Sequence, residues 1–193
     1  MSRDDREKEI LRAALGLFAR FGYRKTAVED VARETGMTKG NVYFYVRDKR
    51  DLYEKAVGNA LIEWRDSVAA AVECETGAVK RFRVMARRSF EYLSGRPDLR
   101  KILEEDRGIF TLSAGEDRFR EINEGAMGIL RSILEQGIRE KTFRRIDVPH
   151  TTELIFSIYI MFLIKAYVKS EGSSVLKMFE EGLDIILRGL LRK

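Results

Sequence analysis

Residues 26–46 constrain the fold of this chain more than any other stretch. They predict two short helices separated by a tight turn, because Gly36 suits the left-handed conformation through which many helices end. Thr26, with Glu29 three residues later, has the spacing of a capping box for the first helix, and Thr38 is placed to cap the second. Two helices joined by a glycine-containing turn are the pattern of the helix-turn-helix, whose second helix enters the major groove of DNA.

The second helix, expected over residues 39–45, is richer in polar and aromatic residues than a helix that only packs on a core. Val42 and Val46 are expected to face the core. Among the outward residues, Asn41 can bond adenine at two atoms, and Gly40 lets the backbone approach its target closely. The other outward side chains expected to read bases or touch phosphates are Thr38, Lys39, Tyr43, Phe44 and Tyr45. The alternative is an exposed aromatic corner on a helical bundle.

The net positive charge is concentrated in the same part of the chain. Residues 1–50 hold 12 Lys and Arg against 8 Asp and Glu, a net charge of +4. The whole chain carries +5, so residues 51–193 contribute only +1. A basic excess around the helix-turn-helix is what binding to a polyanion requires.

Composition predicts an all-α, globular protein without catalytic machinery. The chain is 45% hydrophobic and 35% charged, has only 2 Pro, and lacks alternating strand patterns. Its single Cys excludes an intrachain disulfide. The sequence shows no secretory apolar core at its start, and the apolar run 154–164 is shorter than the about 20 residues that span a bilayer. We therefore expect a cytoplasmic protein with no membrane association, no metal, no cofactor and no enzymatic activity.

A first helix, expected to end at Gly22, supplies the third wall of a small core. In that core we expect Phe18 and Phe21 to pack against Val28, Val31 and Val42. Arg24 and Lys25 follow, either as phosphate contacts or as a solvated loop.

The next helix is long enough to link two domains. Asp48 can cap a helix that runs to about residue 73, about 37 Å at 1.5 Å per residue. Lys49 in its first turn is unfavourable for the helix dipole and suggests an outside anion such as phosphate. The predicted domains are residues 1–47 and residues 48–193.

The second domain is predicted to be a larger helical bundle that binds an effector and dimerises. Its aromatic and Met residues on apolar faces are either core or the lining of a site for a small hydrophobic or aromatic effector. The candidates are Trp64, Met85, Phe90, Phe110, Met127, Leu130, Phe156, Tyr159 and Phe162. The segment 154–164 is apolar nearly all round, so a second subunit is an economical cover, with the last two helices forming a four-helix interface. Its candidate residues are Ile155, Phe179, Leu183, Ile186, Leu187 and Leu190.

The chain resembles the TetR/AcrR family of bacterial transcriptional regulators over roughly residues 8–57. The resemblance rests on Phe21-Gly22-Tyr23, Thr26 with Val28 and Val31-Ala32, Gly36-Met37-Thr38-Lys39-Gly40-Asn41-Val42-Tyr43, and Asp48-Lys49-Arg50-Asp51-Leu52. It implies an all-α homodimer with an amino-terminal three-helix DNA-binding domain and a larger ligand-binding and dimerisation domain.

By position in the family motif, the resemblance also implies roles for individual residues. Thr38, Lys39, Asn41, Tyr43 and Phe44 match the surface that reads bases and backbone. Thr26, Tyr45 and Lys49 match positions that hold phosphates. The chain departs from the family at Tyr45, where His is common, and at Val46, where Phe is common.

Two function classes fit these observations. The first is a repressor that binds a palindromic operator as a homodimer and is released by a small effector. The second is a helix-turn-helix dimer whose second domain binds another protein. An enclosed cavity would favour the first, and exposed apolar patches would favour the second.

Overall fold

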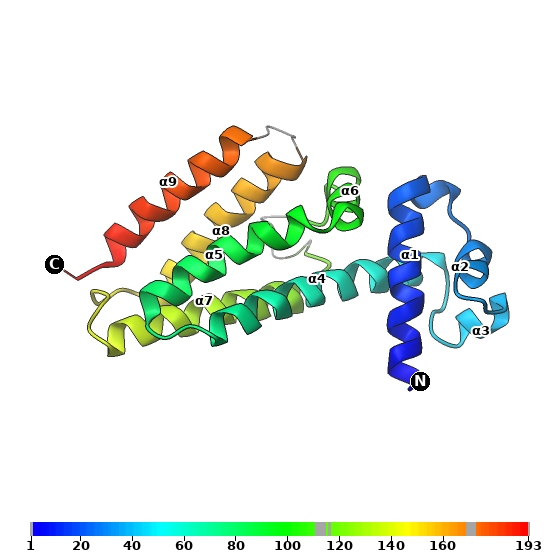
Figure 1. Cartoon of the computed structure of the whole chain (residues 1–193), viewed down its shortest axis with the longest axis horizontal. Helices are drawn as coiled ribbons and strands as arrows, with labels where there is room; N and C mark the ends of the chain where they lie inside the picture. The colour runs from blue at the N-terminus through cyan, green and yellow to red at the C-terminus, as the bar shows by residue number, and fades with distance from the viewer. Residues whose placement is uncertain (1, 111–114, 116, 169–172, 193) are drawn as a thin grey trace. The chain divides into compact units, whose positions relative to one another are not determined.

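The structure is a computed structural model that describes residues 2–110, 115, 117–168 and 173–192. Within these residues every regular element is helical, as the sequence predicts (Figure 1). The elements are α1 (Arg3–Lys25), α2 (Val28–Glu34), α3 (Lys39–Tyr43), α4 (Lys49–Glu73), α5 (Ala78–Ser94), α6 (Pro97–Glu105), α7 (Arg120–Arg139), α8 (Val148–Leu163), a π-helical segment (Ile164–Val168) and α9 (Ser173–Leu190).

The chain divides into two compact units. The amino-terminal unit comprises Met1–Glu63 with Arg96–Ile102, and the carboxyl-terminal unit comprises Trp64–Gly95 with Leu103–Lys193. The first unit contains the helix-turn-helix, and the second contains the larger helical bundle.

The amino-terminal unit is built around the core predicted for its first helices. Phe18, Val31 and Val42 are fully buried, and Phe18 packs edge-to-face on Tyr53 of α4 with ring centroids 5.1 Å apart. Phe21 is not part of this core, contrary to the prediction, because its side chain is 50% exposed beneath the guanidinium of Arg20.

Ion pairs join three helices of the amino-terminal unit at Glu63 of α4. Its carboxylate lies 2.8 Å from Arg12 of α1 and 3.2 Å from Arg96, which precedes α6. Arg96 in turn reaches Asp98 at 3.2 Å. Burial acts to raise the pKa of Glu63, but the hydrogen bonds from the two guanidinium groups outweigh it and the pKa is lowered.

In the carboxyl-terminal unit, α7 packs against both α5 and α8, and α9 packs against α5 (Figure 1). A tight contact closes the turn after α7. Gly137 is buried beneath the ring of Phe143, and a Cβ at this position would lie 2.0 Å from a ring carbon. The glycine is therefore required by close packing.

α8 and the π-helical segment that follows it form one continuous apolar stretch. Val148–Tyr167 is long and apolar enough to cross a membrane by composition alone, and 28% of it is buried inside the described structure. The run 154–164 is therefore the centre of a longer apolar stretch. A buried helix of a bundle or an interface helix has the same composition.

Candidate nucleic-acid interface

The turn between α2 and α3 has the geometry predicted from Gly36. This glycine adopts a φ of +64°, and the following residue, Met37, donates its backbone N–H to Ala32 at 2.7 Å. The side chain of Thr38 then accepts a hydrogen bond of 3.2 Å from the backbone of Asn41. The predicted cap of the second helix is therefore confirmed.

The predicted cap of the first helix is wrong. α2 begins at Val28, and its N-cap is Ala27, whose N–H donates to the Asp30 carboxylate at 2.8 Å. Thr26 is 2% exposed, and its hydroxyl donates to the carbonyls of Leu17 and Gly22. The hydroxyl of Thr26 bonds the end of α1 instead of facing solvent. It is therefore not exposed for the phosphate contact predicted for it.

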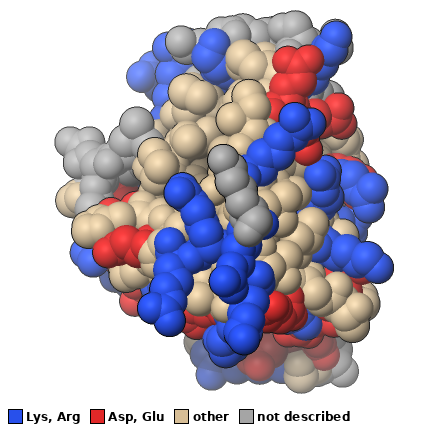
Figure 2. Space-filling model, turned by 90° about the vertical axis from the view of Figure 1, so that its left-hand side faces the viewer, with Lys and Arg blue, Asp and Glu red and all other residues tan. Residues whose placement is uncertain are grey.

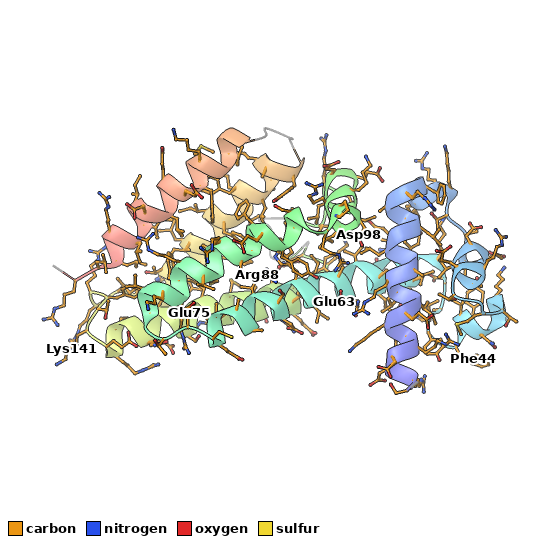
Figure 3. All side chains as sticks on the ribbon, viewed as in Figure 1. Phe44, Glu63, Glu75, Arg88, Asp98 and Lys141 are labelled. Atoms are coloured by element: carbon orange, nitrogen blue, oxygen red, sulfur yellow. The ribbon has the colours of Figure 1, made fainter. Side chains whose placement is uncertain are left out.

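The side chains of α3 divide into one buried face and one exposed face, as predicted. Val42 is fully buried, and Val46, three residues after the helix ends, is 3% exposed. Phe44, at the end of the helix, is 77% exposed (Figure 3). The remaining exposed members of the predicted reading surface are Thr38, Lys39, Gly40, Asn41 and Tyr43.

Lys39 is held in place by two neighbours. Its ammonium pairs with Glu29 of α2 and lies 5.8 Å from the centroid of the Tyr43 ring. The hydrogen bond between the two charged groups raises the pKa of Lys39 and lowers the pKa of Glu29. An exposed pair of this kind contributes little to stability, so a DNA phosphate can replace the carboxylate at low cost.

Lys49 and Tyr45 are partly enclosed by the unit itself. The ammonium of Lys49 donates to the carbonyl of Arg24 at 3.2 Å and lies 4.6 Å from the centroid of the Tyr23 ring. A backbone carbonyl and an aromatic face therefore already contact this cation in the first turn of α4. Tyr45 is half-buried, with the guanidinium of Arg3 6.0 Å from its ring centroid.

Further cations on this unit were not assigned by the sequence analysis. Arg47 is exposed, and its guanidinium lies 2.9 Å from Asp51, whose pKa is lowered by that hydrogen bond. Arg50 is exposed on the next turn and pairs with Glu54 at 3.0 Å. The local charge excess and, for Arg50, its place in the family motif were the sequence signals for them. Arg24 and Lys25, left undecided by the sequence, are exposed and make no ion pair within the described residues.

In the carboxyl-terminal unit, several candidates for an effector site form one aromatic cluster. Phe90 of α5 lies 6.1 Å from Tyr159 and 4.2 Å from Phe179 by ring centroids. Phe162 reaches the same Phe179 at 5.3 Å, and Phe156 reaches Tyr159 at 6.1 Å. The cluster combines side chains of α5, α8 and α9.

Ser89 supplies a polar junction at the edge of this cluster. Its hydroxyl donates to the Met85 carbonyl at 2.8 Å and hydrogen-bonds the side chain of Tyr159, while its carbonyl accepts from the Trp64 indole at 3.0 Å. Burial raises the pKa of Tyr159, so its hydroxyl remains protonated and can donate a hydrogen bond. Trp64 also lies parallel to the ring of Tyr92 at 6.4 Å.

The other predicted effector residues are dispersed over the same unit. Leu130 is 2% exposed on α7, while Met85, Met127 and Phe110 are half-buried. No group of three metal-binding side chains occurs among the residues that were described.

The residues predicted for a dimer interface mostly face inward. Ile155, Phe179, Leu187 and Leu190 are each no more than 7% exposed within one chain, and Leu183 and Ile186 are half-buried. These side chains form the inner stripe of α8 and α9. The apolar residues on the outer face are Leu154, Met161, Met178 and Ile185, with exposures of 61%, 43%, 40% and 72%. In each helix the two exposed residues are seven positions apart, so they share a face.

Comparison with known families identifies the helix-turn-helix. Residues 10–56 match the model of the bacterial regulatory proteins of the tetR family. The HTH-type transcriptional regulator YhgD of Bacillus subtilis is 23% identical over 159 residues, which cover 82% of this chain and 83% of that protein. The fatty acid metabolism regulator protein of the same organism is 19% identical and covers 96% of this chain and 95% of that protein.

Solved structures share the fold over nearly the whole chain. A TetR transcription regulator from Haloarcula marismortui has a TM-score of 0.81 at 23% identity, covering 98% of this chain and 100% of that one. The transcriptional regulator FadR from Bacillus subtilis, solved in complex with stearoyl-CoA, has a TM-score of 0.76 at 19% identity and covers 94% of this chain and 98% of that one. These likenesses establish an amino-terminal helix-turn-helix followed by a larger helical domain.

Proposed function

Since residues 10–56 match the model of the tetR family of bacterial regulatory proteins, we propose that this chain is a cytoplasmic repressor of that family that binds a palindromic operator as a homodimer. An effector that binds the second domain releases it from DNA. The proposed domains are residues 1–47, for DNA binding, and residues 48–193, for effector binding and dimerisation.

One observation carries this proposal. α3 buries Val42 and turns a set of polar and aromatic side chains to solvent. Asn41 is the proposed bidentate contact to adenine, and Tyr43 and Phe44 are proposed to pack on base edges. Lys39 is proposed to exchange Glu29 for a phosphate, and Thr38 and Gly40 to bring the backbone close to the duplex. Lys49 and Tyr45 are proposed to hold phosphates at the edge of this surface.

Selection from a random duplex pool tests the proposal. The full-length protein should enrich a palindrome whose half-sites lie about one helical turn, about 34–36 Å, apart. Asn41→Ala should then weaken binding to the selected sequence by about 1–3 kcal/mol and relax preference at one base pair per half-site. Arg87→Ala, an exposed residue of α5, is the control. Enrichment of no palindrome, or an Asn41→Ala variant with unchanged preference, would refute the proposed reading surface.

The homodimer is proposed to form through the outer faces of α8 and α9. Its support is the exposed apolar stripe of Leu154 and Met161 on α8 and Met178 and Ile185 on α9. Dimerisation would remove this apolar stripe from water. We propose no membrane association for the protein. Ile185→Asp should convert the dimer to a monomer in light scattering while helicity is retained. A dimer of unchanged mass and affinity would exclude this face.

The effector is proposed to be a fatty acyl-CoA, the class of ligand bound by the FadR relative. The aromatic cluster of Phe90, Tyr159, Phe162 and Phe179 offers an apolar environment for an acyl chain. The hydroxyl of Tyr159, a half-buried residue, hydrogen-bonds Ser89 at its edge. Stearoyl-CoA should lower operator affinity, and stability against urea should rise with its concentration.

A second function, binding of another protein by the second domain, is favoured by the same exposed stripe. The dimer test above separates the two, because a stripe covered by a second copy is unavailable to a different protein.

A further inference from the structure

Four cations gather at the end of the carboxyl-terminal unit where α9 finishes. They are Lys141, Arg144, Arg145 and Arg192, here called the carboxyl-terminal basic patch. All four are exposed, and none makes an ion pair within the part of the chain that is described. Figure 2 looks at this end of the unit and shows Lys and Arg side chains gathered over its centre, and Figure 3 labels Lys141 there.

The backbone beneath the patch is fixed by hydrogen bonds between two segments. The backbone N–H of Arg144 donates to the Leu190 carbonyl, and that of Arg192 donates to the Thr142 carbonyl, both at 2.9 Å. Phe143, between these bonds, is buried against Gly137. The backbone that carries the patch is therefore held in one conformation. This lowers the conformational entropy that is lost when its side chains bind a ligand.

The segments that carry the patch are much more positive than the rest of residues 51–193. Residues 139–145 and 188–192 hold six Lys and Arg and one Glu, a net charge of +5. Residues 51–193 carry only +1 in total, so the rest of them carries −4. Repulsion among clustered cations destabilises a fold unless an anion binds there.

Two acidic groups near the patch, Glu140 and Asp184, are already engaged. Glu140 accepts hydrogen bonds from the Ala78 backbone at 3.1 Å and from the Gln136 side chain at 2.6 Å, and these bonds lower its pKa. Arg188 and Arg83 share Asp184 at 2.8 Å and 3.1 Å. The four patch cations are thus left for an external anion.

Two helices connect the patch to the aromatic cluster. α8 begins three residues after Arg145, and α9 ends two residues before Arg192. Along α9, Phe179 precedes Leu190, the last residue of the helix, by eleven residues, about 17 Å, and Arg192 follows two residues later. A long acyl chain has a comparable length, so a ligand with its apolar tail in the cluster and its anionic head on the patch would have to span this length of α9.

We infer that the carboxyl-terminal basic patch binds the phosphate groups of a coenzyme A head group. Three arginines and a lysine suit this ligand, since guanidinium groups bond phosphate oxygens in pairs and coenzyme A carries several phosphates. The inference rests on the proposed acyl-CoA effector and adds the position of its head group.

The test measures the affinity of the full-length protein for three probes by calorimetry. They are stearoyl-CoA, stearate and free coenzyme A. The two probes with acyl chains are used below the concentrations at which they form micelles. The patch variant is R144Q/R145Q/R192Q, and the matched control R87Q/R120Q/R131Q removes three exposed arginines elsewhere in the same unit. Lys141→Gln tests one patch charge outside the two tied segments, so the proposal stays testable even where the triple variant misfolds.

The patch variant should bind stearoyl-CoA at least tenfold more weakly and with a shallower dependence on salt, because counterion release is reduced. Its affinity for stearate should stay unchanged, and the control should bind all probes like the wild type. A patch variant that binds stearoyl-CoA normally overturns the inference and leaves the acyl-CoA effector standing. A variant that loses operator affinity instead assigns the patch to DNA and also overturns it. A wild-type protein that does not bind stearoyl-CoA overturns both the effector and the patch assignment.

Discussion

α3 and α9 differ in how clearly their sequences show which side faces inward. α3 has one aliphatic residue, Val42, and the structure buries it alone, while the aromatic Tyr43 stays exposed. α9 has apolar residues on more than one side, and Phe179 points inward while Ile185 points outward. A helix with few apolar residues has only one side that can face the core. A helix with apolar residues on several sides has more than one possible orientation, and packing against neighbouring helices decides which one is adopted.

The largest expected effect separates the two faces of α9. Phe179→Ala should reduce the free energy of unfolding by about 3–5 kcal/mol, because it removes a ring that packs on both Phe90 and Phe162. Ile185→Ala should instead cause a loss that depends on protein concentration, because it weakens only association. Urea unfolding at several protein concentrations measures both. If both variants lost the same free energy of unfolding at every protein concentration, both residues would belong to the core of one chain.

The sequence predicted most of the amino-terminal unit because its signals are local. Caps at Thr38 and Asp48, the left-handed Gly36 and the buried valines act over three or four residues, and the structure confirms each. Thr26 was misassigned because both Thr26-to-Glu29 and Ala27-to-Asp30 have capping spacing, and only the packing against α1 decides between them.

The carboxyl-terminal unit was predicted less completely because its contacts join residues far apart in sequence. The inward side of α9 depends on Phe90, and the basic patch depends on segments more than forty residues apart. No pattern of neighbouring residues in the sequence predicts either of these contacts. Helix existence was predictable from apolar periodicity, but the partner of each face was not.

A smaller effect is expected within α7, where two glycines provide a matched pair. Gly137→Ala should lower the free energy of unfolding by about 1–3 kcal/mol, since the added Cβ would lie 2.0 Å from the Phe143 ring. Gly128→Ala meets nothing within 4 Å and should raise it by up to about 1 kcal/mol, because alanine favours a helix. Urea unfolding of both variants measures the difference. Equal effects would mean that Phe143 does not pack on α7.

An effect near 1 kcal/mol is expected at Thr26. Thr26→Val keeps the shape of the side chain but removes the hydroxyl that donates to Leu17 and Gly22, so stability should fall by about 1 kcal/mol. Operator affinity, measured well below the unfolding transition, should not change. Reduced affinity with unchanged stability would return Thr26 to the DNA-binding surface. Thr38→Ala, at a cap beside the reading surface, is the comparison expected to alter both.

The smallest effect concerns pH and the ion pairs that join the helices of the amino-terminal unit. The folded state lowers the pKa of Glu63 below its ordinary 4.5, so its pairing with Arg12 and Arg96 stabilises the fold fully above that pH. The contribution is lost as the pH falls from 4.5 through the folded pKa, because the unfolded chain then takes up the proton more readily. Glu63→Gln should therefore reduce the stability difference between about pH 6 and about pH 3.5 by less than about 1 kcal/mol. Glu73→Gln, exposed on the same helix, should leave that difference unchanged, and an equal response of both variants would show that Glu63 gains nothing from its two arginines.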